Sequence, residues 1–253
     1  MIWAREMLKI YSFYRGNGDG ELLRDHVSEA LRYAADFNDS KLVRMITSLR
    51  GGEKFIQLLT LSIILHDAGK VFLQDNRKKD RLGVEYISFA GHEFLSALLT
   101  KLLMDEVLLD ENFPEARVPV FAVYYHHHAM NPLTRKRFLQ PAVQAAQKNL
   151  DLAQAVYEVL GDFLPYEYRG RLCEALEKFH KILNVEYIES SVKAMIDDEL
   201  VKRADPHLFK LALTTLDALI VCDYLAASKR SEKAPSAFSS AVSMFHKIWT
   251  AKI

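Results

Sequence analysis

The stretch Phe55-Ile-Gln-Leu-Leu-Thr-Leu-Ser-Ile-Ile-Leu-His66-Asp67-Ala-Gly-Lys70 carries the strongest signal in the sequence. It is a long apolar run that predicts a buried helix, and it ends on a His-Asp pair. More histidines and an aspartate lie in or near other apolar segments: His26, His92, His126, His127, His128 and Asp223. Imidazoles and carboxylates buried in a core are costly unless a partner satisfies them. A shared metal site is the simplest explanation of this set.

Apolar residues recur at helical spacing nearly throughout the 253 residues, and strand-like alternation is scarce. We therefore expect an all-α fold. The periodicity predicts helices at about 21–37, 40–49, 54–68, 90–109, 117–130, 140–161, 168–183, 186–202, 207–228 and 236–250.

No stretch is long enough, or low enough in complexity, to be an interdomain linker, so we expect one domain over residues 1–253. Residues 133–205 contain no candidate ligand apart from the isolated His180. We expect them to form a helical insertion or lid on the histidine-bearing core, or alternatively a docking surface.

Composition narrows the class of protein further. The 33 basic and 33 acidic side chains cancel, so there is no global electrostatic signature of a nucleic-acid binder, although a local basic stripe could still contact phosphates. The two cysteines, Cys173 and Cys222, are far apart and suggest neither a disulfide framework nor a thiolate zinc site. We expect a soluble, cytoplasmic protein with no signal peptide and no membrane span.

The spacing of the candidate ligands indicates where a metal site would lie. His66 and Lys70 share a helix face, and Asp67 is adjacent. The other candidates come from separate segments, so the site should lie in the centre of a helical bundle. Imidazole and carboxylate ligands together suit Mn²⁺, Fe²⁺, Co²⁺, Ni²⁺ or Zn²⁺. Asp67 is the natural bridge if two ions bind.

The order of His26, His66-Asp67, Gly91-His92, His126-His127 and Asp223 resembles that of the HD superfamily of metal-dependent phosphohydrolases. The segments His66-Asp-Ala-Gly-Lys70, Tyr125-His-His-His128 and Asp223-Tyr-Leu-Ala-Ala-Ser228 are most similar to the stand-alone HD nuclease of type I CRISPR interference systems.

The resemblance implies an HD-type helical bundle that hydrolyses phosphodiester bonds of single-stranded DNA. It implies one or two divalent ions (Mn, Ni, Co or Fe, with Mg possible), and Asp67 and Lys70 as catalytic residues. The partners it implies are a superfamily 2 helicase and an RNA-guided surveillance complex. Because no G-x-x-x-x-G-K-[ST] occurs here, we expect the helicase to be a separate polypeptide. The metal ligands it implies are His26, His66, Asp67, His92, His126, His127 and Asp223.

The sequence departs from this pattern in two places. Three consecutive histidines stand where the family usually has two, so the pair is either His126-His127, which we favour, or His127-His128. Asp217 competes with Asp223 for the last ligand position, and the following Leu-Ala-Ala-Ser favours Asp223. An alternative with the same metal chemistry is a phosphohydrolase of nucleotides or cyclic nucleotides, which would need a closed pocket.

Two basic clusters follow the ligand segments and could guide a DNA backbone. One comprises Arg77, Lys78, Lys79 and Arg81, and the other comprises Arg135, Lys136 and Arg137. Charge runs are most often solvated loops, so a solvated loop without a binding role is the competing interpretation. Phe72, Phe89 or Phe138 could stack on bases beside these clusters.

Overall fold

Helices dominate the computed structural model, which describes residues 9–16, 18–108, 114–127, 132–202, 205–229 and 237–252. The expected all-α class is confirmed. The α-helices of the described residues are α1 (Leu23–Ala35), α2 (Lys41–Ile46), α3 (Phe55–Leu65), α4 (His92–Leu108), α5 (Arg117–Tyr125), α6 (Pro132–Arg135), α7 (Leu139–Lys148), α8 (Ala153–Leu160), α9 (Tyr166–Ile182), α10 (Val185–Tyr187), α11 (Pro206–Ser228) and α12 (Ala237–Trp249).

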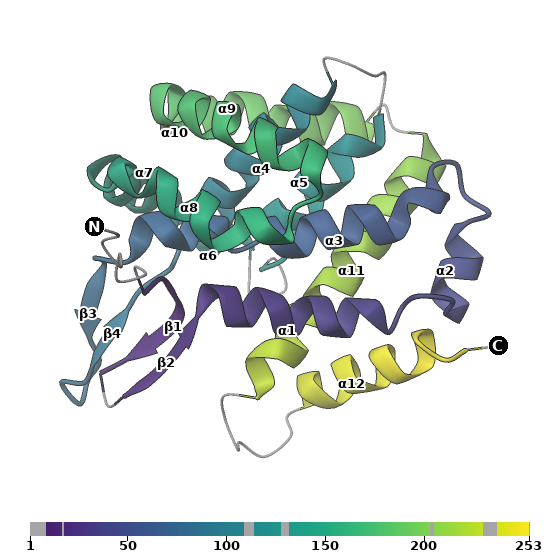
Figure 1. The fold of residues 1–253 in the computed structure, drawn as a ribbon, viewed down its shortest axis with the longest axis horizontal. Helices are drawn as coiled ribbons and strands as arrows, with labels where there is room; N and C mark the ends of the chain where they lie inside the picture. The colour runs from purple at the N-terminus through teal and green to yellow at the C-terminus, as the bar shows by residue number, and fades with distance from the viewer. Residues whose placement is uncertain are drawn as a thin grey trace, which may run out of the picture.

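A small antiparallel sheet, which the sequence reading did not anticipate, lies at one end of the molecule (Figure 1). Its strand order is β2-β1-β4-β3. The predicted helix over 21–37 begins too early, because Glu21 and Leu22 belong to β2 and α1 starts directly after them. The strands are β1 (Tyr11–Arg15), β2 (Asp19–Leu22), β3 (Arg77–Lys79) and β4 (Glu85–Ile87).

The helix α3 is the centre of the fold because most of its side chains are apolar and buried, although Gln57 near its start is exposed. The helices α1, α5 and α11 pack against it, and α4 lies across α5 (Figure 1). Beyond α3 the chain forms a 3₁₀ segment, Ala68–Leu73, which packs on α4. Helix α4 also contacts α3, so the helices that carry the candidate ligands, α1, α4, α5 and α11, all pack around it.

Residues 132–202 are helical but more broken than predicted. The expected helix over 140–161 is interrupted at Asn149, whose side chain donates a hydrogen bond to the carbonyl oxygen of Phe72 at 3.1 Å. Residues Ile188–Lys193 and Ile196–Lys202 form π-helix. The helix α9 packs on α4, and Phe179 of α9 stacks on Phe72 with ring centroids 4.9 Å apart. Whether this region is an insertion in one HD domain stays a prediction.

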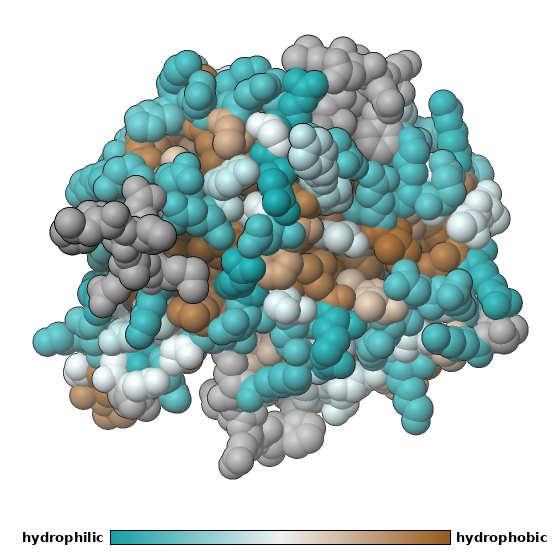
Figure 2. Space-filling model, viewed as in Figure 1, coloured by the Kyte–Doolittle hydropathy of each residue, from teal (hydrophilic) through white to brown (hydrophobic). Residues whose placement is uncertain are grey.

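Two helical segments, Gly52–Leu73 and Pro206–Ser228, are long and apolar enough to cross a membrane by length and composition alone. The expectation that no run approaches a membrane span is therefore not supported. The most apolar windows of the two segments are 78% and 44% buried inside the protein. The core helix of a soluble protein passes the same test, so this is a weak indication. Figure 2 shows polar side chains over most of one face, with apolar surface gathered in a band across its middle, at the level of α3.

Gly69 holds the 3₁₀ segment close to α4. A Cβ atom there would lie 2.4 Å from the carbonyl oxygen of His92 and 2.8 Å from the Cβ of Leu95. Gly69→Ala should therefore lower the free energy of unfolding by about 1–3 kcal/mol, the usual cost of overpacking. Gly170→Ala is the control, because a Cβ at that position in α9 would meet nothing within 4 Å. It should raise stability by roughly 0.5–1 kcal/mol. Urea unfolding measures both, and a Gly69→Ala protein as stable as the wild type would contradict the tight packing.

Candidate metal centre

The end of α3 presents His66 and Asp67 to the interior. The helix ends at Leu65, His66 caps it, and the backbone of Asp67 leaves the helical region with φ −106° and ψ 4°. The side chains of both residues are buried. The Ser96 hydroxyl oxygen of α4 accepts a hydrogen bond from the backbone N–H of Gly69 at 2.8 Å. This bond fixes the turn that carries the His-Asp pair.

Three histidines are oriented by the same kind of local hydrogen bond. The Nδ1–H groups of His66, His92 and His126 donate to the carbonyl oxygens three residues earlier, those of Ile63, Phe89 and Val123, at 2.7, 2.7 and 2.6 Å. Because a carbonyl oxygen can only accept, Nδ1 carries the hydrogen, and in the neutral ring Nε2 then has the lone pair that a metal needs. Metal-binding histidines are commonly held in this way.

The Nε2 atoms of His66 and His126 are buried and have no hydrogen-bond partner. A buried, unpartnered acceptor is unfavourable, and it needs an explanation. A metal ion at the centre would satisfy both atoms, so the donor atoms present fit a metal site.

Asp67 lies between two groups of histidines. Its Oδ2 is 3.5 Å from Nε2 of His26 and 3.4 Å from Nε2 of His66. Its Oδ1 is 2.9 Å from Nε2 of His92. Each carboxylate oxygen therefore faces a different group. This arrangement is the one that a bridging carboxylate requires.

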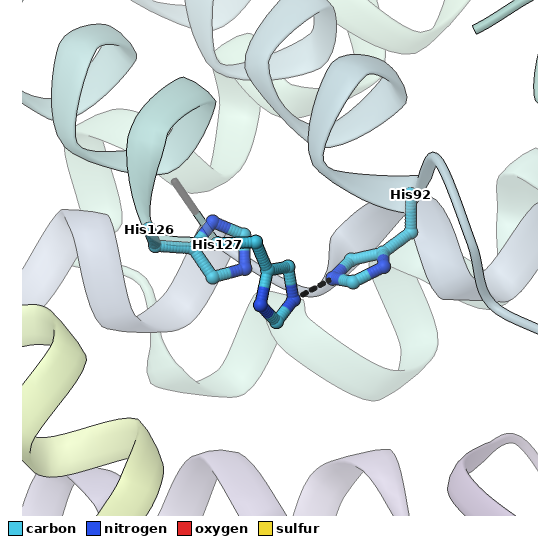
Figure 3. Close-up of side chains that lie close together, drawn as sticks. All are labelled: His92, His126 and His127. Carbon is cyan, nitrogen blue, oxygen red and sulfur yellow. Dashed lines mark hydrogen bonds between the residues drawn. The ribbon is translucent and has the colours of Figure 1, made fainter. Parts of the chain in front are cut away.

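The donor atoms form two clusters, each within 4.8 Å: His26, His66 and Asp67, and His92, His126 and His127. Figure 3 shows the second cluster, in which His127 reaches toward His92 with 3.2 Å between their Nε2 atoms. His92 begins α4, whereas His126 and His127 directly follow α5. Both clusters could hold a metal ion.

Asp223 joins the first cluster from α11. Its Oδ1 lies 3.0 Å from Nε2 of His26 and 3.6 Å from Nε2 of His66. Asp217 makes no described contact with this centre, and burial alone raises its pKa. Of the two competing aspartates, Asp223 is thus the one that the structure brings to the candidate ligands.

Burial and neighbouring groups shift the pKa values of Asp67 and His126 away from their usual values. Burial raises the pKa of Asp67, but the adjacent His66 ring, the Lys70 ammonium and a hydrogen bond from His92 outweigh it and hold the pKa well below its usual range. Burial, with the nearby rings of His66 and His92, lowers the pKa of His126 to about 3. His126 is therefore neutral at pH 7, as a metal ligand must be.

His26 behaves differently from His126. Burial disfavours its charged form, but hydrogen bonds to Asp223 and Glu21 outweigh burial and raise its pKa to about 9. In the metal-free protein His26 therefore carries a proton at neutral pH. Binding of a metal through its Nε2 would release that proton.

The structure brings together the seven proposed ligands: His26, His66, Asp67, His92, His126, His127 and Asp223. His128, the alternative to His126, lies outside the described residues. The sequence reading missed Glu21, whose Oε2 is 3.2 Å from Nδ1 of His26. Glu21 lies on β2, so no helical spacing linked it to His26.

Lys70 is buried beside the centre. Its Nζ donates a hydrogen bond to Oδ2 of Asp67 at 2.6 Å, and it lies 5.6 Å from the centroid of the Phe89 ring. Lys70 is thus the cation that balances the Asp67 carboxylate, and it lies on the side of the first cluster.

The first basic cluster lies mostly on a strand and not in a loop. Arg77, Lys78 and Lys79 form the exposed edge strand β3, and Arg81 is exposed in the turn after it. Arg77 forms an ion pair with Glu85 of β4 at 2.6 Å. Its side chain is therefore less available to a phosphate than those of its neighbours.

The second basic cluster is largely paired with carboxylates. The guanidinium of Arg135 contacts both carboxylate oxygens of Glu93, at 2.7 and 2.5 Å. Lys136 pairs with Glu189 at 2.7 Å, and Arg137 is exposed and lies 4.7 Å from the centroid of the Phe138 ring. Whether either cluster binds nucleic acid stays a prediction.

The expectation that Phe72 could stack on a base is wrong, because Phe72 is fully buried in the core.

The geometry thus defines a buried histidine–aspartate centre that could bind metal ions. Comparisons of the chain with models of protein families, with curated proteins and with solved structures found no match.

Metal binding should depend on Asp223 and not on Asp217. Asp223→Asn removes a charged oxygen 3.0 Å from His26, so the affinity for Mn²⁺ should fall roughly tenfold or more. Asp217→Asn is the matched control on the same helix, and its affinity should stay close to that of the wild type. Metal titration of chelator-treated protein, followed by the shift in thermal unfolding midpoint, measures both. The reverse ranking of the two variants would contradict the assignment.

Proposed function

We propose that the protein is a metal-dependent nuclease that hydrolyses phosphodiester bonds of single-stranded DNA. The observation that carries the proposal is the position of Asp67, whose two oxygens face two separate histidine clusters inside a helical bundle. The resemblance of the sequence to HD phosphohydrolases supports the same reaction class. The imidazole-rich donor set favours Mn²⁺, Ni²⁺, Co²⁺ or Fe²⁺ over Mg²⁺, which prefers oxygen ligands.

When bound, one or two such ions would activate a water molecule and stabilise the leaving oxygen of a phosphodiester. The chain's own residues hold the donor atoms in place. Carbonyl groups fix the rings of His66, His92 and His126. Lys70 orients the Asp67 carboxylate, and its charge would also balance the negative charge of a phosphate.

Polymer binding is the part of the proposal that rests on the basic clusters. Lys78 and Lys79 are exposed on the edge strand β3, and no ion pair described in the structure involves them. Such lysines can contact the phosphates of a single strand whatever its base sequence. The resemblance further suggests that the nuclease works in the cytoplasm with a separate superfamily 2 helicase and an RNA-guided CRISPR surveillance complex.

A second candidate function is hydrolysis of nucleotides or cyclic nucleotides. One observation favours it: a cleft of about 250 Å³ adjoins the second histidine cluster and is lined by His127. A pocket of this kind could enclose part of a small substrate.

Turnover of defined substrates separates the two functions. Wild-type protein with Mn²⁺ should degrade labelled single-stranded DNA faster than duplex DNA, RNA or a panel of nucleotides.

Asp67→Asn should lose this activity by orders of magnitude, since it removes the charge that faces both clusters. We choose Asn in place of Ala to keep a hydrogen-bond acceptor beside the buried Lys70. Asp217→Asn is again the control. If the wild-type protein selectively hydrolysed one of the nucleotides, the second function would be favoured. Full activity of Asp67→Asn would overturn both proposed functions.

Binding to single strands should weaken when the lysines of β3 are removed. Replacing Lys78 and Lys79 by Ala should lower the affinity for every sequence and flatten the salt dependence by roughly 0.7 per lost phosphate contact. The control replaces Lys148 and Lys181, which are also exposed, by Ala and so changes the net charge equally. Fluorescence anisotropy at several salt concentrations measures the slopes. If both double variants have the same slope, β3 is not part of the DNA path.

A further inference from the structure

The cleft beside the second histidine cluster has the features of a binding site for a flat, uncharged group. Its walls come from the start of α4, the end of α5 and the segment that includes α6, α7 and the π-helix Ile188–Lys193. Phe94, Tyr124, Tyr125 and Leu139 give it a mainly apolar and aromatic lining. Aromatic rings are the side chains on which nucleobases stack most readily.

The cations of the cleft are already paired. Arg135 contacts Glu93, Lys136 contacts Glu189, and Lys193 contacts Asp197. Because each cation has a carboxylate partner, the cleft is not an open anion site. A phosphate would therefore be better placed at the metal centre, with the uncharged part of the same molecule in the cleft.

The cleft and the metal centre share a wall. His127 lines the cleft and also belongs to the cluster with His92 and His126. The neighbouring Tyr125 is only half buried, and its ring packs against Phe121 at 5.0 Å and Tyr124 at 4.9 Å. The two tyrosine rings are thus held by aromatic neighbours next to the candidate ligands.

The size of the cleft limits what can enter it. Its volume of about 250 Å³ lies below the roughly 300–1,000 Å³ of sites that enclose a whole drug-sized ligand. A single nucleobase with part of its sugar is of suitable size for this volume. The wall formed by Ile188–Lys193 is π-helical, a rare conformation that is often found at functional sites.

We propose that this cleft binds one nucleobase whose attached phosphate lies at the metal centre. The inference rests on the proposed function, which places phosphodiester chemistry at that centre. It adds a base-binding subsite in which Tyr124 and Tyr125 are the stacking residues. Such a subsite tolerates different bases, because every base has a π-face. The base can belong to a single strand or to a free nucleotide, and these two sources share the same chemistry.

Binding in the presence of EDTA tests the subsite without any hydrolysis. The probes are an oligodeoxythymidine, an abasic oligomer of the same length, and thymidine 5′-monophosphate as competitor. Wild-type protein should bind the oligodeoxythymidine more tightly than the abasic oligomer. Tyr125→Leu should weaken binding to the oligodeoxythymidine by about fivefold to 150-fold, the loss of one base–aromatic stack. Its binding to the abasic oligomer should be unchanged, and Tyr125→Phe should bind both as the wild type does.

A second pair of variants tests Lys136, the exposed lysine that lines the cleft. Lys136→Ala should weaken binding of both oligomers slightly and equally, because its exposed ion pair with Glu189 is weak and the ammonium can still attract a backbone phosphate outside the cleft. Lys202→Ala is the control, because Lys202 is equally exposed and forms a comparable surface ion pair with Asp198. Its binding should not change. If Lys202→Ala weakens binding as much as Lys136→Ala does, the cleft has no special part in binding.

Cross-linking locates the base in wild-type protein, in case Tyr125→Leu does not fold. An oligomer that carries 5-iododeoxyuridine should cross-link to the peptide containing Tyr124 and Tyr125. Cross-links confined to β3, or equal losses of Tyr125→Leu on the thymidine and abasic oligomers, would overturn the inference. Thymidine 5′-monophosphate that binds as tightly as the oligomer would keep the subsite but assign it to a free nucleotide. Base-dependent binding without metal-dependent hydrolysis would keep the subsite and reject the nuclease proposal.

Discussion

The negative charge of the buried Asp67 carboxylate determines how the centre of the protein is arranged. A carboxylate removed from water is strongly unfavourable unless cations and hydrogen-bond donors surround it. Lys70 contacts Oδ2, His26 and His66 lie next to the same oxygen, and His92 contacts Oδ1. These contacts require α1, α3 and α4 to meet at one point, which is the carboxyl end of α3. The packing of the bundle and the composition of the centre therefore depend on the same group.

The histidines are held more rigidly than an ion pair with Asp67 alone would require. In His66, His92 and His126 a local carbonyl accepts the Nδ1–H, so the direction of Nε2 is set by the backbone. The cost appears at Nε2 of His66 and His126, which are left buried without a partner. A protein that needed these residues only for stability would gain from apolar side chains of similar size. The arrangement is understandable if the free nitrogen atoms are kept for metal ions.

Local apolar periodicity predicted the helical class, whereas the set of converging residues came from histidines in apolar segments and from the resemblance of the motifs to HD phosphohydrolases. The apolar run that ends at His66 predicts a buried helix, and its end is where a buried His-Asp pair needs partners. The sheet was missed because β3 and β4 have only three residues each and β3 is fully polar. Glu21 was missed for the same reason, since its contact with His26 depends on where β2 passes into α1.

Long-range pairing was beyond the reach of the sequence pattern. Arg135 reads as a free basic residue beside Lys136 and Arg137, yet it is paired with Glu93, which is 42 residues away in the chain. The cleft beside His127 could not be predicted from the sequence for the same reason, because α4, α5 and the π-helix come together only in the folded chain. Charge and aromatic content were visible in the sequence, but their partners were not.

The most direct test of the account is a crystal structure of the protein soaked in Mn²⁺, with anomalous diffraction recorded at the manganese absorption edge. The account predicts an anomalous peak within coordination distance of Asp67 and the Nε2 atoms of His26 and His66, or of His92, His126 and His127, and peaks at both places if two ions bind. The absence of a peak at either cluster, or peaks only on the protein surface, would contradict it.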